Sequence, residues 1–413
     1  MLIQYSVKNY KSIKDEVIIN FSAMDKNVEE SKLIREKDFG CPLYKCIGLV
    51  GPNASGKSNI INSLFFALRY INSTIKRKET AKIGVEMFLL DKASREDAST
   101  FEFISWEKGT KYVYGFTVNT EKVLEEYLLA YYSKKATTLF EREDKNTAVY
   151  NFKGNDVKLQ SEIAQKTNPN RLYMPVAAEW GYEKARVPYK WFEKMYRQYS
   201  DMNISQVIEK VLKEESLKSV LLEMLVKADF NIKDIYVKKR KMEKEYRDAL
   251  LQFLRQMIGE SDVAENIVPE DSPVIWITHA GEEGQIFDVM LDEDSSGTKD
   301  IVDNLAELLF INKEGGLFIE DEFARNYHTK LTEYFLRLFH DTSINNGKAQ
   351  LLFSTHDTKV FNLLNPEQIY LVDKDENGTT YVKLLDDYLI REKDNIELGY
   401  LKGRYGAIPN IKE

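Results

Sequence analysis

The segment of this sequence best suited to chemistry is a glycine-rich loop that ends in a lysine and a serine. Residues 51–58 read Gly-Pro-Asn-Ala-Ser-Gly-Lys-Ser, which fits the pattern G-x-x-x-x-G-K-[ST]. Glycines let a backbone wrap closely around phosphate groups, and the N–H groups of such a loop point inward at the anion. In this pattern Lys57 would reach the β- and γ-phosphates of a nucleotide, and the Ser58 hydroxyl would ligate Mg²⁺.

The segments on either side of the loop favour a phosphate site over a chance turn. Residues 47–50 are a short apolar run typical of a strand, and residues 59–68 have the pattern of a helix. A helix that starts at the loop adds the partial positive charge of its N-terminus. We therefore expect ATP with magnesium, bound by Gly51, Asn53, Ala54, Ser55, Gly56, Lys57, Ser58 and Asn59.

A second chemical feature is a pair of carboxylates at the end of an apolar strand. Residues 315–322 read Gly-Gly-Leu-Phe-Ile-Glu-Asp-Glu. Phosphoryl transfer needs charge neutralisation and a placed nucleophile more than covalent chemistry. Asp321 is therefore expected to be an outer ligand of the magnesium ion, and Glu322 to be the base that orients the attacking water. Glu320 stands where the last strand residue is usually apolar, which leaves the division of roles among these neighbours open; a plain acidic turn is the alternative.

Two further segments would complete a nucleotide site. Residues 350–357 form a buried-looking strand that ends in His356, where a histidine could hydrogen-bond a γ-phosphate or the attacking water. Residues 294–299, Asp-Ser-Ser-Gly-Thr-Lys, precede an amphipathic helix and have the small hydroxylated residues of an anion site. Because one phosphate loop is already complete, Ser296 and Gly297 would contact a nucleotide held by another subunit. A structural histidine and a plain helix cap are the respective alternatives.

The elements needed to position these residues lie at the two ends of the chain. Residues 1–70 and about 270–413 carry short apolar strands joined to helical stretches, the pattern of an α/β layer. Residues 86–150 are β-rich, with a hairpin turn at Lys108-Gly109, and residues 188–258 are charged with apolar positions at helical spacing. We predict an α/β fold with a mixed sheet, a β-rich N-terminal lobe and a helical insertion, divided as 1–185, 186–265 and 266–413.

Composition excludes several classes of protein. With 43% hydrophobic and 30% charged residues, the 413-residue chain is that of an ordinary globular protein. It has no apolar run near the ~18 residues needed to span a bilayer and no signal-peptide pattern, so we expect a cytoplasmic protein without membrane contact. Cys41 and Cys46 form no CxxC pair and are expected to be reduced structural thiols.

Nucleic acid is a candidate partner only through a local basic run. The formal net charge of −8 gives no overall electrostatic footprint for nucleic acid. The densest group of positive charges is Lys238, Lys239, Arg240 and Lys241, with Lys244. Such a run could contact DNA phosphates, but the exposed start of a helix is the simpler interpretation.

The order of loop, hydroxyl-glycine segment, acid pair and histidine resembles that of the ABC-type ATPase heads of SMC-like proteins and of the OLD-type and abortive-infection ATPases. Residues 2–13 are similar to the opening strand and N-[FY]-[KR]-S turn of this family, and residues 354–358 match its switch histidine. Residues 321–328 are similar to its DE…LH stretch, with Tyr327 where leucine is commoner. The tail at residues 400–409 looks like the closing motif of the AbiLi/RloA-like AAA-type ATPases of bacterial phage-defence and restriction loci.

This resemblance implies a P-loop NTPase fold of the ABC/SMC-head type, with ATP held between the two heads of a dimer and hydrolysis releasing them. Ser296 and Gly297 would contact the γ-phosphate across the interface, with Thr298-Lys299 in place of the usual Gly-Gln. Residues 326–328 would form the D-loop at the same interface. No glutamine near residues 86–90 fits the Q-loop of the family.

The function implied by the resemblance is an ATPase that senses a trigger and controls an effector in anti-phage defence. Because no nuclease pattern follows His356, the effector would be a separately encoded chain, with a nuclease as the leading candidate. The alternative is an SMC-like DNA clamp or tether that uses ATP only to close. A small-molecule kinase is disfavoured by the hydroxyl-glycine segment and the histidine.

Overall fold

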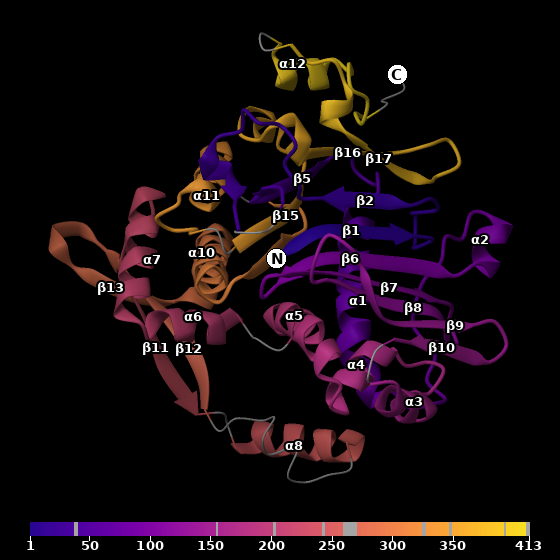
Figure 1. Cartoon of the computed structure of the whole chain (residues 1–413). Coiled ribbons are helices and arrows are strands. Elements are labelled where there is room, and N and C mark those ends of the chain that lie inside the picture. Colours follow the sequence, from indigo (N-terminus) through magenta and orange to yellow (C-terminus); the bar gives the residue numbers. More distant parts are fainter. Residues whose placement is uncertain are drawn as a thin grey trace. The chain divides into compact units, whose positions relative to one another are not determined.

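The computed structural model describes residues 1–36, 40–153, 156–200, 204–241, 244–258, 271–323, 328–346, 349–391 and 394–409 (Figure 1). The chain forms two compact units. The first comprises Met1–Tyr199 and Glu314–Glu413, and the second comprises Ser200–Lys313. The first unit therefore contains both ends of the chain, where the sequence predicts an α/β layer.

A five-stranded mixed sheet carries most of the predicted site residues of the first unit. Its strand order is β14-β15-β5-β16-β17, and all neighbours are parallel except β16 and β17. The parallel strands are continuous apolar runs, as expected for strands covered on both faces. The strands are β5 (Cys46–Val50), β14 (Gly316–Glu320), β15 (Ala349–Thr355), β16 (Ile369–Lys374) and β17 (Thr380–Leu384). The carboxyl ends of β5, β14 and β15 consequently lie at one edge of the sheet.

A seven-stranded antiparallel sheet forms the β-rich lobe, with the order β10-β9-β8-β7-β6-β1-β2. The predicted hairpin turn between β6 and β7 is confirmed, with φ values of 48° at Lys108 and 78° at Gly109. The strands are β1 (Leu2–Lys8), β2 (Val17–Asn20), β6 (Ser99–Glu107), β7 (Thr110–Val118), β8 (Val123–Tyr131), β9 (Thr137–Asp144) and β10 (Ala148–Phe152). The alternation of buried and exposed residues along β6 is typical of such a sheet.

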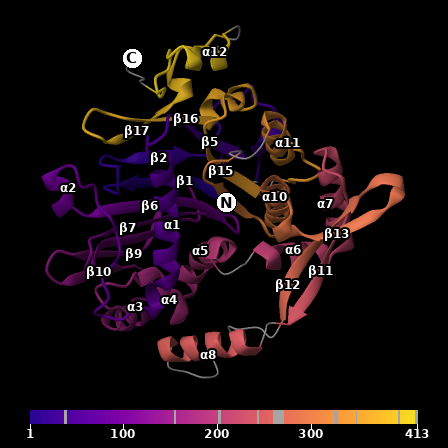
Figure 2. The same cartoon turned by 180° about the vertical axis from the view of Figure 1, so that it is seen from behind.

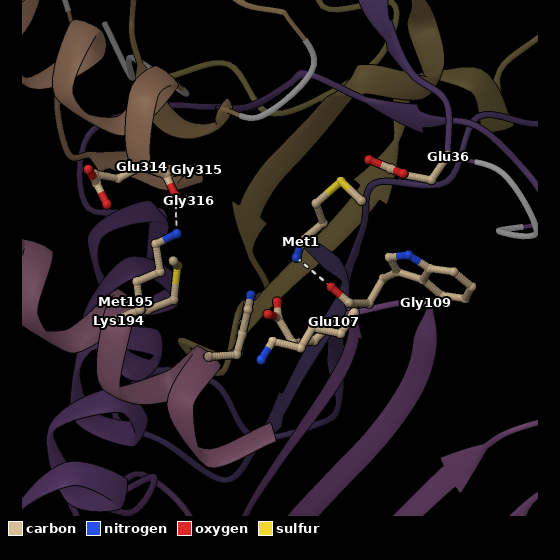
Figure 3. A pocket seen from close by; sticks show the side chains of 12 residues that line it. Met1, Glu36, Glu107, Gly109, Lys194, Met195, Glu314, Gly315 and Gly316 are labelled. Carbon is tan, nitrogen blue, oxygen red and sulfur yellow. Dashed lines mark hydrogen bonds between the residues drawn. The ribbon is translucent and has the colours of Figure 1, made fainter. Parts of the chain in front are cut away.

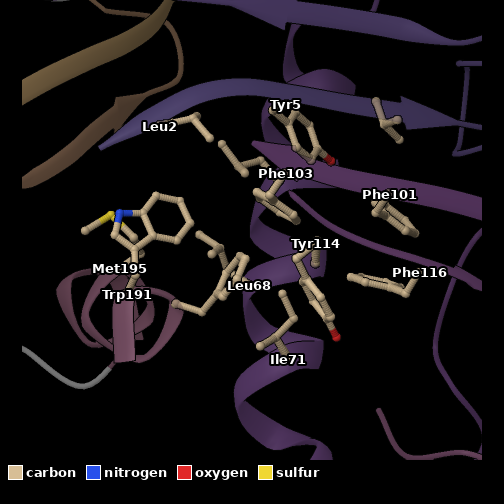
Figure 4. Packing of buried hydrophobic residues seen from close by; sticks show 14 of the residues in the cluster. Leu2, Tyr5, Leu68, Ile71, Phe101, Phe103, Tyr114, Phe116, Trp191 and Met195 are labelled. Carbon is tan, nitrogen blue, oxygen red and sulfur yellow. The ribbon is translucent and has the colours of Figure 1, made fainter. Parts of the chain in front are cut away.

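Helix α1 (Lys57–Ser73) contacts both sheets, through β1 and β15. Leu68 and Ile71 on this helix face a cluster of aromatic side chains from β6 and β7 (Figure 4). Trp191 of α5 (Glu183–Ser200) lies at one end of the same cluster (Figure 4). Large aromatic side chains contribute much of the apolar area buried in a core. The packing of α1 therefore fixes the position of the loop that precedes it.

The five-stranded and seven-stranded sheets are also joined by polar contacts. The Gln350 side chain donates to the carbonyl of Leu2 and accepts from its N–H, both at 2.8 Å. Strand β17 contacts β2 (Figure 2). The other elements of this unit are β3 (Leu33–Ile34), β4 (Leu43–Tyr44), α2 (Lys92–Glu96), α3 (Val157–Gln165), α4 (Tyr173–Glu179), α11 (Thr329–His340) and α12 (Ile396–Leu401).

The second unit combines helices with an antiparallel sheet of order β11-β12-β13. Helices α6 and α7 contact the sheet, and the buried Ile235 and Ile277 lie on one of its faces. The elements are α6 (Ile204–Leu212), α7 (Glu215–Lys227), β11 (Ile232–Lys241), α8 (Lys244–Ile258), β12 (Asp271–Ala280), β13 (Ile286–Met290) and α10 (Ser296–Glu314), whose last residue belongs to the first unit.

The segment 186–265, expected to be a helical insertion, is therefore partly β, and the second unit extends to Lys313. The basic run Lys238 to Lys241 lies in strand β11, so its assignment to the start of a helix is wrong. Ile235 and Val237 are β-branched residues two positions apart, which suits a strand, and pairing with β12 outweighs the helix propensity of the lysines that follow. Helix α8 begins after this run, at Lys244.

Candidate functional site

The phosphate-type loop joins β5 to α1, as predicted. Helix α1 begins at Lys57, and its N-cap residue is Gly56 with φ of 111°, a left-handed conformation that suits glycine. Gly51 is required for a different reason, because a Cβ there would lie 2.1 Å from the carbonyl oxygen of Val372 on β16. Asn53 and Ala54 lie at the exposed tip of the loop. The backbone is thus shaped by β16 and by α1 before any ligand is present.

The side chains of the loop fit a phosphate and a metal ion. Lys57 is buried, and its Nζ donates to the carbonyls of Gly51 and Pro52, each at 2.9 Å. The Ser55 hydroxyl is buried and makes no hydrogen bond within the described residues. Ser58 is half-buried at the second position of α1. An ammonium group, an unpaired hydroxyl and a helix N-terminus at one place are the donors that a polyphosphate requires.

The charge on Lys57 depends on the acid pair. Burial lowers the pKa of Lys57 to about 8, and the nearby carboxylates of Asp321 and Glu322 oppose this shift. The lysine therefore carries its proton at neutral pH, although less tightly than an exposed lysine would. The structure brings together three of the residues predicted from separate segments of the sequence.

The acid pair follows β14 and is oriented by Ser354 on β15. The Ser354 hydroxyl donates to the Asp321 carboxylate at 2.5 Å and accepts from the Glu322 N–H at 2.8 Å. Glu322 has φ of 58°, a left-handed conformation that is uncommon for a residue other than glycine. One serine thus fixes Asp321 through its side chain and Glu322 through its backbone.

Ser354 is a residue of the site for which the sequence patterns predicted no separate role. It is completely buried near the end of β15, directly after the apolar run Leu351 to Phe353 and two positions before His356. A hydroxyl buried in a strand needs a hydrogen-bond partner, and a serine at such a position is the sequence signal that could have identified this residue. Its partners directly follow β14, a strand that a sequence pattern alone does not place beside β15.

His356 lies directly after β15, as predicted, and interacts with the same groups. Burial and the charge of Lys57 lower its pKa, whereas Glu322, a hydrogen bond to the Gly51 backbone and Asp321 act in the opposite direction. The net direction is downward, which favours a neutral imidazole at neutral pH. A neutral ring has a single N–H, so it could donate that hydrogen to an anion in exchange for its bond to the Gly51 backbone, without adding a charge.

The hydroxyl-glycine segment lies in the second unit, at the start of α10. Ser296 is exposed, and a Cβ added to Gly297 would meet no atom within 4 Å. The preceding Asp294 accepts a hydrogen bond from His279 of β12 at 2.7 Å. Burial acts to raise the pKa of Asp294, but hydrogen bonds from Thr298 and His279 together with other contacts hold it below the usual range. This segment is consequently anchored within its own unit. Of the expected D-loop, residues 326 and 327 lie outside the described residues, and His328 is the N-cap of α11.

A cavity of about 300 Å³ in the first unit is separate from this site (Figure 3). It lies at the amino end of β14 beside Gly315 and Gly316, with Trp106, Trp191 and Lys194 among its other lining residues. Ligands of open parallel sheets bind outside the carboxyl ends of the strands, where the loop and the acid pair lie. The cavity therefore has no part in the nucleotide site.

The sequence of residues 46–170 and 226–362 matches the model of a protein family described as "AAA domain, putative AbiEii toxin, Type IV TA system". The matched segments make up more than half of the chain and include the loop, the acid pair and His356. The chain belongs to this family of AAA domains. No curated protein is significantly similar to it.

Two solved structures match this AAA-family chain over nearly its whole length. One is the SMC head domain from Thermotoga maritima, at a TM-score of 0.38 and 15% identity, covering 93% of this chain and 98% of that chain. The other is an SmcHead bound to the C-winged helix domain of ScpA, at a TM-score of 0.44 and 11% identity, covering 94% and 99%. The predicted α/β P-loop NTPase fold is confirmed by the family match and by the strand order around the loop. Over the described residues, none of the helices is long and apolar enough to cross a membrane.

Proposed function

We propose that this AAA-family protein binds ATP with magnesium and hydrolyses it. The observation that carries the proposal is the convergence of Lys57, Asp321, Glu322 and His356 at the carboxyl ends of three neighbouring strands. Bound magnesium would neutralise charge on the β- and γ-phosphates, held by Ser58 directly and by Asp321 as an outer ligand. Lys57 would exchange its two loop carbonyls for phosphate oxygens.

In the proposed reaction a water oxygen attacks the γ-phosphorus while the bond to the β–γ bridging oxygen breaks, which releases ADP and phosphate. Glu322 orients that water and accepts its proton. Its left-handed conformation and the bond from its N–H to Ser354 hold the backbone from which the carboxylate extends. His356, as a neutral donor, would hydrogen-bond the γ-phosphate or the water.

We further propose that a complete site needs two copies of the chain. Ser296 and Gly297 form a second anion site on a polypeptide that already has a complete phosphate loop, so they would contact the γ-phosphate held by the partner copy. The open space around Gly297 supports this proposal, because it leaves room for a ligand to approach the backbone. ATP binding would then favour a dimer, and hydrolysis would release it.

The biological role that we propose is control of a separately encoded effector, with a nuclease as the leading candidate, in anti-phage defence. Its support is the family description, which names an AbiEii-type toxin and a toxin–antitoxin system. An SMC-like DNA clamp is the second candidate, since the exposed basic residues of β11 could contact DNA phosphates. Strongly salt-dependent DNA binding with negligible turnover would favour the clamp, and nucleotide-dependent control of a co-expressed effector would favour the regulator.

The test of ATP binding compares the wild type with Lys57→Ala. Loss of a hydrogen-bonded charge should weaken binding of a fluorescent ATP analogue roughly 10- to 100-fold, and chelation of magnesium should abolish phosphate release. Lys82→Ala, which removes an exposed lysine, is the matched control and should bind like the wild type. Equal affinity in Lys57→Ala and the wild type would refute the assignment of the loop.

A further inference from the structure

The phosphate loop is held by a residue far away in the sequence, Thr380, the first residue of β17. Thr380 is 1% exposed, and its hydroxyl donates to the carbonyl oxygen of Ser55 at 2.9 Å. The same hydroxyl lies 2.7 Å from the hydroxyl of Ser12, which in turn accepts from the Asn59 side chain at 2.7 Å. A line of hydrogen bonds thus crosses from α1 to the loop through two other segments.

The direction of this line follows from the donors available. The carbonyl of Ser55 can only accept, so the single hydroxyl hydrogen of Thr380 is used there. Ser12 must then donate its own hydrogen to Thr380, which leaves its oxygen to accept from Asn59. Each of the two hydroxyl hydrogens therefore has a single acceptor, so only one hydrogen-bonding arrangement satisfies all of these groups. A second contact, from the Thr380 N–H to the Ser12 carbonyl at 2.7 Å, holds the two segments together.

This line determines how the loop presents its next N–H group. In a planar trans peptide the C=O and the following N–H point in opposite directions. Since the Ser55 carbonyl points at Thr380, the Gly56 N–H points away from Thr380. Thr380 also occupies the space beside Gly56, where a Cβ would lie 2.0 Å from the threonine hydroxyl oxygen. The loop therefore packs against Thr380 on one side, and its Gly56 N–H points to the other side.

We propose that Thr380 is a positioning residue for nucleotide binding, which acts with Ser12 to aim the Gly56 N–H at the phosphates. This inference rests on the proposed ATP-binding function of the loop. It gives Ser12, the last residue of the turn at 9–12, a physical role, and it makes the β16–β17 hairpin part of the binding site. The threonine itself does not touch the nucleotide.

The experiment compares Thr380→Val, which keeps the shape and removes the hydroxyl, with Thr380→Ser, which keeps the hydroxyl. Affinities for ATP, ADP and AMP are measured with each folded variant. Thr380→Val should weaken binding of ATP and ADP about tenfold, because the loop binds the β- and γ-phosphates. AMP has neither of these phosphates, so its binding should be unchanged. Thr380→Ser should restore ATP affinity to within about twofold of the wild type. The loss should appear in KM, with kcat within about twofold of the wild type.

Thr332→Val is the matched control. Thr332 is also completely buried, but its hydroxyl makes no hydrogen bond within the described residues, so its removal should leave nucleotide affinity unchanged. If Thr380→Val does not fold, Ser12→Ala removes the donor to Thr380 from a less buried position and should weaken ATP binding about threefold. Wild-type affinity in folded Thr380→Val, or in Ser12→Ala when only that variant folds, would overturn the inference. A wild type that binds no ATP would instead overturn the proposed function.

Discussion

At the scale of single residues, Glu322 is the group on which the proposed reaction depends. Its backbone is left-handed, and its N–H donates a hydrogen bond to Ser354. The negative charge of its carboxylate acts to raise the pKa of both Lys57 and His356. The carboxylates that act to raise the pKa of these two groups are those of Asp321 and Glu322. Both residues lie beyond the end of β14, whereas Glu320 is the last residue of the strand. We therefore propose Glu322, rather than Glu320, as the base.

Glu322→Gln should retain ATP binding and lose turnover by roughly 10²- to 10⁴-fold, because glutamine has the shape of glutamate but cannot accept the proton of the attacking water. ATP affinity is measured with a fluorescent analogue, and turnover is measured by phosphate release. Glu320→Gln is the matched control and should keep wild-type turnover. Loss of turnover in Glu320→Gln but not in Glu322→Gln would move the base to the other carboxylate.

At the scale of elements, the loop is shaped by the strand beside it as much as by its own sequence. Strand β16 pairs with β5, and its Val372 carbonyl approaches Gly51 so closely that a side chain cannot fit. The motif pattern requires a glycine at this position, and the fold supplies the reason. Backbone atoms cannot move aside as a flexible side chain can, so the constraint is rigid.

Gly51→Ala should therefore displace the loop, because its Cβ would lie 2.1 Å from the Val372 carbonyl oxygen. We expect a loss of about 1–3 kcal/mol in the free energy of unfolding, as for other overpacked sites, and at least about tenfold weaker ATP binding. Thermal unfolding and nucleotide titration measure the two effects. Gly84→Ala is the control, since a Cβ at that position meets no atom within 4 Å, and it should change neither quantity.

At the scale of the whole molecule, the proposal concerns two copies of the chain and one nucleotide. The segment that would reach the partner copy is anchored inside the second unit by the contact of His279 with Asp294 and by the bond from the Thr298 N–H to the Ser295 hydroxyl. It can therefore present Ser296 and Gly297 as a preformed surface. Preformed donors bind a ligand with less loss of conformational entropy than a mobile loop would.

Gly297→Ala should distinguish the stability of a single copy from the stability of the dimer of two copies. Because a Cβ there meets nothing within the chain and alanine favours a helix over glycine, thermal stability should not fall. The added methyl group would obstruct the partner's γ-phosphate, so the ATP-dependent dimer should weaken at least about tenfold, as measured by light scattering in the Glu322→Gln background. A dimer as stable as that of Glu322→Gln alone would rule out the composite site.

The sequence by itself determined the features that depend on neighbouring residues. The loop at residues 51–58 is contiguous, and the strand before it and the helix after it have clear periodicity, so its place between β5 and α1 was predictable. The acid pair and His356 were predictable because each ends an apolar strand. The strand β11 was missed, since its basic half carries no apolar alternation and is held in place by pairing with β12.

Only the tertiary structure decided which distant groups meet at the site. Ser354 bonds both Asp321 and Glu322 because β15 pairs in parallel with β14, and Thr380 reaches Ser55 because β17 pairs with β16 at the edge of the same sheet. Hydrogen bonds of this kind join residues that no local spacing relates. Each depends on strand order and register, which bring segments far apart in the sequence side by side. The sequence therefore indicated the groups that we propose for the chemistry, and the fold supplied those that hold them in position.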